Sequence, residues 1–175
     1  MPSLDQRLGF TRYEADAAYK RALEAYRKGD YDAALDLLNA ALDAQPGRSE
    51  LLAARGLVFL EDGEKDRARA DFEAALKAFP YEMLAQYGLG AAAYREGQWE
   101  QALDHFTRAL YIDQERGETL YYLALTYYQL KNYPQAQTTM QRALQQLEAA
   151  NHKGKADAVR WLRELSRHTT LNRSG

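Results

Sequence analysis

The sequence predicts an all-α solenoid of antiparallel helix pairs, on three observations. The seven-residue segment at 29–35 recurs at 63–69, 97–103 and 131–137, each copy starting 34 residues after the last. Small and large apolar residues recur at fixed places in the same frame. Only 4 prolines and 11 glycines occur in 175 residues, which favours helix. A period of this length with helical spacing inside it indicates stacked helix-turn-helix repeats.

The recurring columns predict where two helices approach each other. The small columns are Ala22, Gly56, Gly90 and Ala124; Ala34, Ala68, Ala102 and Ala136; and Ala41, Ala75, Ala109 and Ala143. The large apolar columns are Leu38, Phe72, Phe106 and Met140, and Leu42, Leu76, Leu110 and Leu144. Spacings of three, four and seven residues predict two amphipathic helices per repeat, with close backbone packing at the small columns.

The frame defines four repeats and two flanking segments. The repeats are 15–48, 49–82, 83–116 and 117–150, preceded by an N-terminal segment at 1–14. Thr11 to Glu14 has the pattern of a capping box, which allows the first helix to begin before the repeat frame. After the last repeat, Trp161, Leu165 and their apolar neighbours predict a capping helix within 151–168 that covers the open end of the stack. Residues 169–175 are expected to be a frayed tail.

A glycine marks the turn between the two helices in each of the first three repeats. Gly29, Gly63 and Gly97 lie where a first helix ends and a left-handed residue is needed. The fourth repeat has Lys131 and Asn132 there, and Asn132 either takes the left-handed conformation or caps the next helix. Pro134 is expected in the first turn of that helix.

These columns resemble the tetratricopeptide-repeat (TPR) family, whose 34-residue helix-turn-helix has small residues at positions 8, 20 and 27. The resemblance covers 15–150 and implies a right-handed superhelical TPR solenoid. Two departures are notable, because position 7, usually leucine, is Arg21 in the first repeat and Arg55 in the second. We expect slightly looser packing in those helices.

The resemblance also implies a partner-binding groove, because positions 2, 5, 9, 12 and 13 of TPR repeats usually face a concave surface. The residues predicted to bind a partner there are Tyr19, Tyr26, Arg27, Leu57, Leu60, Tyr87, Tyr94, Arg95, Tyr121, Leu125 and Tyr128. Leu23, Ala53 and Ala91 occupy the remaining apolar positions. Tyrosines suit a contact surface because each combines a large ring with a hydroxyl group. The alternative is that several of these rings pack between neighbouring helices and complete the core.

The predicted function is a protein-protein interaction adaptor that binds a peptide or an amphipathic helix of another protein. A carboxylate clamp is not expected, since the groove positions carry tyrosine, leucine and alanine where such clamps use lysine, asparagine and arginine. One alternative is a self-assembling homo-oligomer. In that case Leu4, Leu8 and Phe10 could enter the groove of their own or a neighbouring molecule, or simply cap the first repeat. Another alternative is a small export chaperone, because the layout is similar to TPR chaperones of type III secretion.

Composition argues against other classes of function. The net charge is −2, and residues 1–150 carry 17 basic against 23 acidic residues, so no broad basic face for nucleic acid is expected. The six basic residues against two acidic ones in 151–175 are expected to belong to a solvated last helix, and the alternative is a contact with an acidic partner. Cysteine is absent, which excludes disulfides and thiolate chemistry. Gly88 and Gly90 lack the third glycine of a dinucleotide motif, and His105, His152 and His168 have no partners at ligand spacing. We therefore expect no enzymatic activity, no cofactor and no metal. No long apolar run predicts membrane insertion, and a cytoplasmic location is expected.

Overall fold

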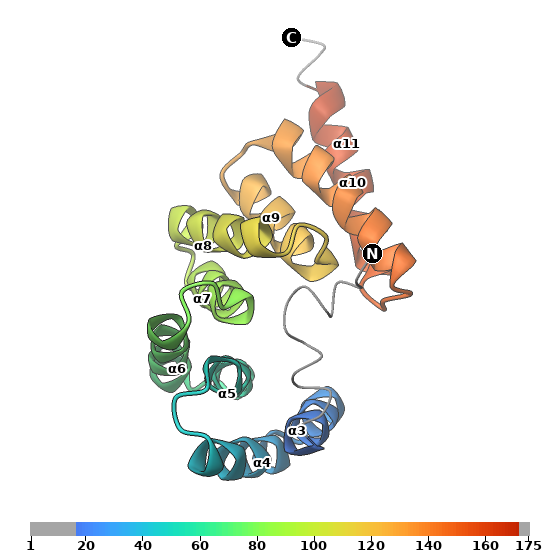
Figure 1. Ribbon diagram of the computed structural model, residues 1–175. Helices are drawn as coiled ribbons and strands as arrows, with labels where there is room; N and C mark the ends of the chain where they lie inside the picture. Colours follow the sequence, from blue (N-terminus) through green and yellow to red (C-terminus); the bar gives the residue numbers. More distant parts are fainter. Residues whose placement is uncertain (1–16, 172–175) are drawn as a thin grey trace. The chain divides into compact units, whose positions relative to one another are not determined.

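The computed structural model describes residues 17–171, with side chains for 17–167 (Figure 1). Within this range every regular element is an α-helix. The helices are α3 (Ala17–Lys28), α4 (Tyr31–Ala44), α5 (Ser49–Glu61), α6 (Lys65–Ala78), α7 (Met83–Arg95), α8 (Trp99–Ile112), α9 (Gly117–Gln129), α10 (Tyr133–Ala149) and α11 (Lys155–Leu171). The predicted fold class, an all-α solenoid of helix pairs, is confirmed. The capping box and the apolar residues Leu4, Leu8 and Phe10 lie outside the described residues.

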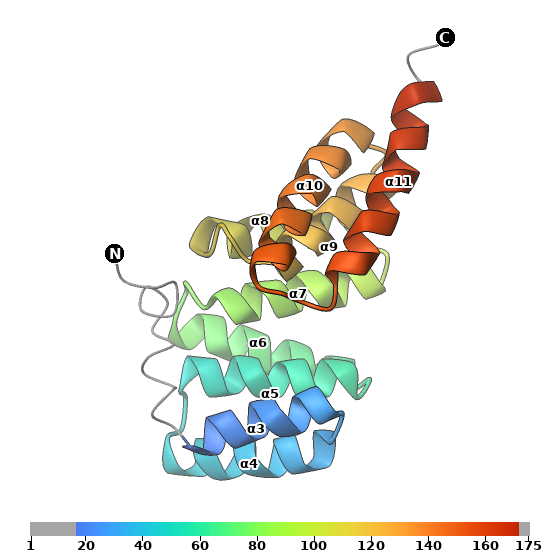
Figure 2. The same cartoon turned by 90° about the vertical axis from the view of Figure 1, so that its right-hand side faces the viewer.

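The chain divides into two compact bodies, and the boundary falls inside α7. The N-terminal body is Met1–Gly88 and the C-terminal body is Leu89–Gly175. In the first, α3 packs on α4, α4 on α5, and α5 on α6. In the second, α8 packs on α9, α9 on α10, and α10 on α11 (Figure 2). The helices of these pairs therefore pack on their neighbours in sequence, as expected of repeats stacked in series.

Phe72 of α6 is the centre of the core in the N-terminal body. Its side chain is fully buried, and Ala68 and Ala75 on the same helix are equally inaccessible. A Cβ built on Gly56 of α5 would lie 2.7 Å from the Phe72 ring, and one on Gly88 would meet the same ring. The small column predicted from the sequence therefore exists because glycine leaves the space that this ring fills.

The C-terminal body repeats the arrangement around Phe106 of α8. The ring is fully buried, and a Cβ on Gly90 would lie 2.7 Å from it. Farther along, Met140 of α10 packs with Leu120 and Ala124 of α9 in a continuous apolar cluster. The large column predicted from the sequence is thus the core of both bodies.

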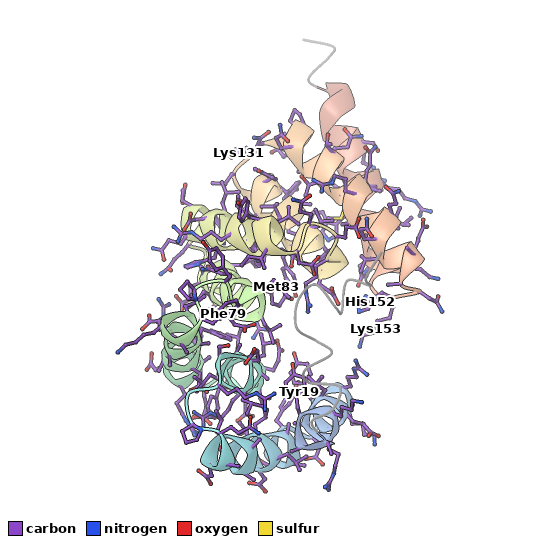
Figure 3. The ribbon with its side chains drawn as sticks, viewed as in Figure 1. Tyr19, Phe79, Met83, Lys131, His152 and Lys153 are labelled. Carbon is purple, nitrogen blue, oxygen red and sulfur yellow. The ribbon has the colours of Figure 1, made fainter. Side chains whose placement is uncertain are left out.

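The turns inside the repeats follow the predicted chemistry. Gly29, Gly63 and Gly97 have φ values of +77°, +86° and +73°, respectively. In the fourth repeat Lys131, labelled in Figure 3, lies in this turn. It takes the left-handed conformation with φ +60°. Asn132 then caps α10, since its side chain accepts a hydrogen bond from the Gln135 amide at 3.4 Å. Of the two roles that the sequence left open for Asn132, the capping role is the one adopted.

The C-terminal helix α11 continues the repeat frame. Ala158 is fully buried and lies 34 residues after Ala124, which is also fully buried. Leu165 is buried too, whereas Arg163 and Arg167 are exposed. The helix ends at Leu171, three residues later than predicted, because no glycine or proline occurs between Arg167 and Leu171. It therefore occupies the place of the first helix of a fifth repeat.

Candidate binding surface

An apolar cleft opens in the N-terminal body between α3 and α5. Its volume, counted with the open mouth, is about 290 Å³. The floor consists of buried residues from four helices: Ala22, Leu38, Ala54, Val58 and Leu84. Leu23 and Tyr26 of α3 and Leu57 of α5 complete the lining and are half-buried. These three are the lining residues with side chains partly accessible to solvent, and each occupies a position that the TPR resemblance assigned to the groove.

The other predicted residues of the N-terminal body differ in exposure. Tyr19 is 4% exposed and Leu60 is 2% exposed, so both belong to the core as the molecule stands. Tyr87 is half-buried, and Arg27 is exposed. Figure 3 labels Tyr19 on α3. The predicted strip is therefore a short accessible cleft flanked by buried residues rather than a continuous exposed stripe.

In the C-terminal body the predicted tyrosines form a network of ring contacts. Tyr94 of α7 lies edge-on to Trp99, with ring centroids 5.2 Å apart, and to Tyr122 at 5.8 Å. Tyr121 meets Tyr122 at 5.6 Å. Phe106 stacks on Tyr122 and is buried, whereas the other rings of the network are half-buried. These tyrosines pack against neighbouring helices and still present part of their surface.

Trp161 of α11 contacts the last of the predicted tyrosines. Its ring lies 5.1 Å from that of Tyr128, which also meets Tyr133 at 5.6 Å. Burial raises the pKa of the Tyr121 hydroxyl, and a hydrogen bond with Trp161 opposes this rise. The remaining predicted residues in this body are Leu125, which is buried, and Arg95, which is exposed at the end of α7. The capping helix thus covers part of the surface at Tyr121 and Tyr128.

Two features of these surfaces were missed by sequence reasoning. The floor of the cleft uses Leu38, which lies outside the family's groove positions, and Leu84, which occupies position 2 of the third repeat but was not among the residues selected. Trp161 was recognised as part of an apolar stripe, but its contact with Tyr128 was not anticipated. The signal was present in the frame, because a capping helix in repeat register brings its own side chains next to those of α9.

The most exposed large apolar side chains of the described residues lie elsewhere. Phe79 is 47% exposed and Tyr81 is 63% exposed, on either side of Pro80 in the loop between α6 and α7. Their ring centroids are 6.1 Å apart. Tyr111 of α8 is 78% exposed. Sequence reasoning did not select these residues.

The polar residues offer one unusual carboxyl group. Glu82 is 9% exposed and precedes α7, where its carboxylate accepts hydrogen bonds from the Ser49 hydroxyl at 3.2 Å and the Leu84 amide at 3.4 Å. Burial, reinforced by the charge of Glu50, raises the pKa of Glu82 to about 7. Within the described residues no cluster of three His, Asp or Glu side chains has the arrangement of a metal site. No helix in that range has the length and apolarity needed to cross a membrane.

Comparisons with known proteins agree on the repeat. One family model described as "Tetratricopeptide repeat" matches residues 11–49, 19–82 and 53–119, and a second model of the same description matches residues 93–156. DnaJ homolog subfamily C member 3 from Gallus gallus is 32% identical over 102 residues, which are 58% of this chain and 20% of that protein. The chain therefore spans about a fifth of the length of this curated relative.

Two solved structures share the fold. TTC0263, a thermophilic TPR protein of Thermus thermophilus, superposes with a TM-score of 0.70 at 22% identity, covering 87% of this chain and 81% of that one. The first TPR domain of Spaghetti (RPAP3), bound to the HSP90 peptide SRMEEVD, has a TM-score of 0.62 at 17% identity, covering 70% and 94%. At these identities the similarity establishes the architecture of stacked helix pairs.

Proposed function

Because the chain belongs to the tetratricopeptide-repeat family, we propose that it is a protein-protein interaction adaptor that binds a peptide or an amphipathic helix of a partner. The observation that carries the proposal is the apolar cleft of the N-terminal body, with Leu23, Tyr26 and Leu57 partly accessible. The proposal includes no catalytic step and assumes a cytoplasmic location.

The cleft suits one apolar anchor of the partner. Its lining is aliphatic except for Tyr26. A leucine, isoleucine or phenylalanine side chain of the partner would therefore move from water into a site where its neighbours are apolar. Burial of such a side chain contributes roughly 1.5–3 kcal/mol. The Tyr26 hydroxyl can add a hydrogen bond to the partner's backbone. A peptide with a single anchor of this kind binds weakly unless further contacts are added.

The tyrosines of the C-terminal body supply a second set of contacts. Tyr94, Tyr121 and Tyr128 present partly accessible rings, and Arg95 adds an exposed positive charge. Tyrosine and arginine are enriched where protein interfaces gain most of their affinity. We propose that these rings form a second contact surface for a partner, built by the C-terminal body alone.

The bound chemistry is expected to differ from that of the RPAP3 domain, which is bound to an HSP90 peptide. The positions of this chain that correspond to a carboxylate clamp carry tyrosine, leucine and alanine instead of lysine and asparagine. The free energy of binding should then come from internal apolar side chains of the partner and not from its terminal carboxylate.

A random 12-residue peptide library displayed on phage tests the proposal with the full chain as bait. Enriched peptides should contain apolar anchors, and their synthetic copies should bind the chain in a fluorescence anisotropy titration. Tyr26→Ala and Leu57→Asp should each weaken binding at least tenfold, while Tyr111→Ala should not change it. Circular dichroism melting of each variant checks that the fold is kept. Absence of any enriched peptide, or equal binding by all three variants, would contradict the proposal.

The exposed pair Phe79 and Tyr81 favours a second candidate function, self-assembly. Two adjacent aromatic rings in an exposed loop suit a contact between copies of the chain. Sedimentation at about 50 μM should then show a dimer or larger species that Phe79→Ser with Tyr81→Ser returns to the monomer. A monomer at that concentration excludes this candidate.

A further inference from the structure

The unit that forms the apolar cleft also carries a candidate occupant. Helix α3 begins at Ala17 and supplies Ala22, Leu23 and Tyr26 to the cleft. The 16 residues that precede it contain Leu4, Leu8 and Phe10. These apolar side chains are therefore tethered to the wall of an apolar cleft.

We propose that residues 1–16 of the same molecule bind in the cleft between α3 and α5 and compete there with the partner. This inference rests on the proposed function, because it assigns regulation to the same surface. In its docked state the N-terminal segment occupies the position of the partner's apolar anchor, and a partner must displace it.

The segment is long enough to reach the cleft. Leu23 lies six residues into the chain from Ala17, which is roughly 9 Å along the helix axis. Phe10 lies seven residues before Ala17 and spans up to about 23 Å when extended. The excess length allows the chain to reverse direction before it runs back along α3. Gly9, next to Phe10, tolerates the backbone conformations that such a path requires.

The chemistry of the segment matches that of the cleft. Leu4 and Leu8 are four residues apart, so a single helical turn places them on one face. The lining of the cleft offers aliphatic surface to both. Asp5 lies beside Leu4 in the sequence, and the exposed Arg27 lies on the same face of α3 as Leu23, four residues farther on. The negative charge of Asp5 therefore suits the positive charge of Arg27 beside the cleft.

Docking within one molecule is favoured over docking between copies. A short tether holds the segment at an effective concentration of about 1 mM near the cleft. A second copy reaches the same occupancy only when the protein concentration approaches that value. The intramolecular mode therefore dominates at micromolar protein.

Photo-crosslinking of the full chain tests where the segment lies. Phe10 is replaced by benzoylphenylalanine, and the light protein is mixed with an equal amount of nitrogen-15-labelled wild-type chain before irradiation. We expect a crosslink from residue 10 to the tryptic peptides 22–27 or 56–65, which contain Leu23, Tyr26 and Leu57. Both crosslinked peptides should be light. Crosslinks to the labelled chain alone would assign the cleft to a second copy and overturn the proposal, as would crosslinks to other peptides or none.

A competition experiment measures the regulatory effect. The probe is the synthetic peptide of residues 1–12, titrated into wild-type chain and into Leu4→Ser with Leu8→Ser and Phe10→Ser. If the peptide binds the cleft with a dissociation constant of about 100 μM, the tether should weaken its binding to wild type about tenfold relative to the triple variant. Adding Leu57→Asp to the triple variant should abolish binding. Equal binding to wild type and triple variant would overturn the proposal.

The two proposals fail in distinguishable ways. If the cleft binds partners but not the segment, library-selected peptides bind wild type and the triple variant equally, and no crosslink to peptides 22–27 or 56–65 forms. If the segment docks but no external partner is bound, the crosslink forms and no library peptide is enriched on either protein.

Discussion

Arg55 of α5 holds the carboxylate of Asp71 on α6 in an ion pair with two hydrogen bonds, Nε to Oδ2 and Nη2 to Oδ1, each 2.8 Å long. Its remaining Nη1 donates to Asn39 Oδ1 of α4, also at 2.8 Å. Hydrogen bonding with Asp71 raises the pKa of the guanidinium against the opposing effect of burial. The position at which TPR repeats usually have leucine is therefore a polar link among three helices of the N-terminal body.

Removal of one partner from this link should destabilise the protein. Asp71→Ala leaves a largely buried guanidinium without its carboxylate, and we expect the free energy of unfolding to fall by about 2 kcal/mol. Replacement of both Arg55 and Asp71 by leucine should restore most of the loss, because no buried charge then remains. Urea denaturation of the three proteins measures both effects. The exposed pair of Lys28 and Glu24 is the control, and Lys28→Ala should cause no measurable change.

Gly56 should resist replacement by alanine although it lies inside a helix. Alanine favours helix over glycine by roughly 1 kcal/mol. A Cβ at this position would nevertheless lie 2.7 Å from the ring of Phe72, which is fully buried. We expect Gly56→Ala to lower the free energy of unfolding by about 1–3 kcal/mol.

Phe72→Leu is the second substitution of a double-mutant cycle with Gly56→Ala. With the smaller side chain present, the additional effect of Gly56→Ala should shrink or reverse. A double-mutant cycle in urea measures the coupling. Additive effects of the two substitutions would show that the ring does not limit residue 56.

Replacement of Lys131 by glycine should stabilise the protein. It is held at φ +60°, a conformation that costs a residue with a Cβ roughly 1 kcal/mol. Lys131→Gly should therefore raise the free energy of unfolding by about 0.5–1 kcal/mol. Gly97→Ala, at φ +73° in the equivalent turn of the third repeat, should lower it by a similar amount. Thermal melting followed by circular dichroism distinguishes the opposite signs.

Glu82 should make stability depend on pH. Its pKa is about 7 in the folded protein, against 4.5 as the ordinary value, so the folded state binds more protons than the unfolded state between these values. The contribution of Glu82 to stability is therefore fully present below about pH 4.5 and is lost as pH rises through 7, a loss of roughly 3 kcal/mol.

Glu82→Gln removes the titration and keeps the shape of the side chain. The variant should show no fall in this pH window and should exceed wild type in stability above pH 7. Urea denaturation at half-unit pH intervals measures the slope. Glu73→Gln, on the exposed face of α6, should leave the wild-type slope intact. A Glu82→Gln curve parallel to that of the wild type would contradict the assignment.

The periodic part of the fold was predictable because it depends on residue size. Ala34, Phe72 and Met140 are buried where the columns place them, since a 34-residue frame repeats the same packing environment. The partners of single side chains were not predictable in this way. Arg55 differs from the consensus, and its acceptor Asp71 is 16 residues away on another helix. Nothing in the local sequence shows that the two meet.

The candidate site was predictable by position but not by exposure. Leu23, Tyr26 and Leu57 line the cleft, as the resemblance implied. Tyr19 and Leu60 occupy equivalent positions and are nearly inaccessible. Exposure depends on which neighbouring side chains fill the space beside each residue, and a single repeat does not determine this. Binding by any of these residues stays a prediction.

The position of α11 in the 34-residue repeat frame affects whether the protein can gain or lose whole repeats during evolution. Because Ala158 repeats the environment of Ala124, the surface of α9 and α10 that receives α11 is of the same type as the surface of α7 and α8 that receives α9. Unequal recombination that adds or deletes one whole repeat ahead of Asn151 would still leave α11 a packing surface of the same type. The length of this protein can therefore evolve in steps of one repeat without a new ending having to arise each time.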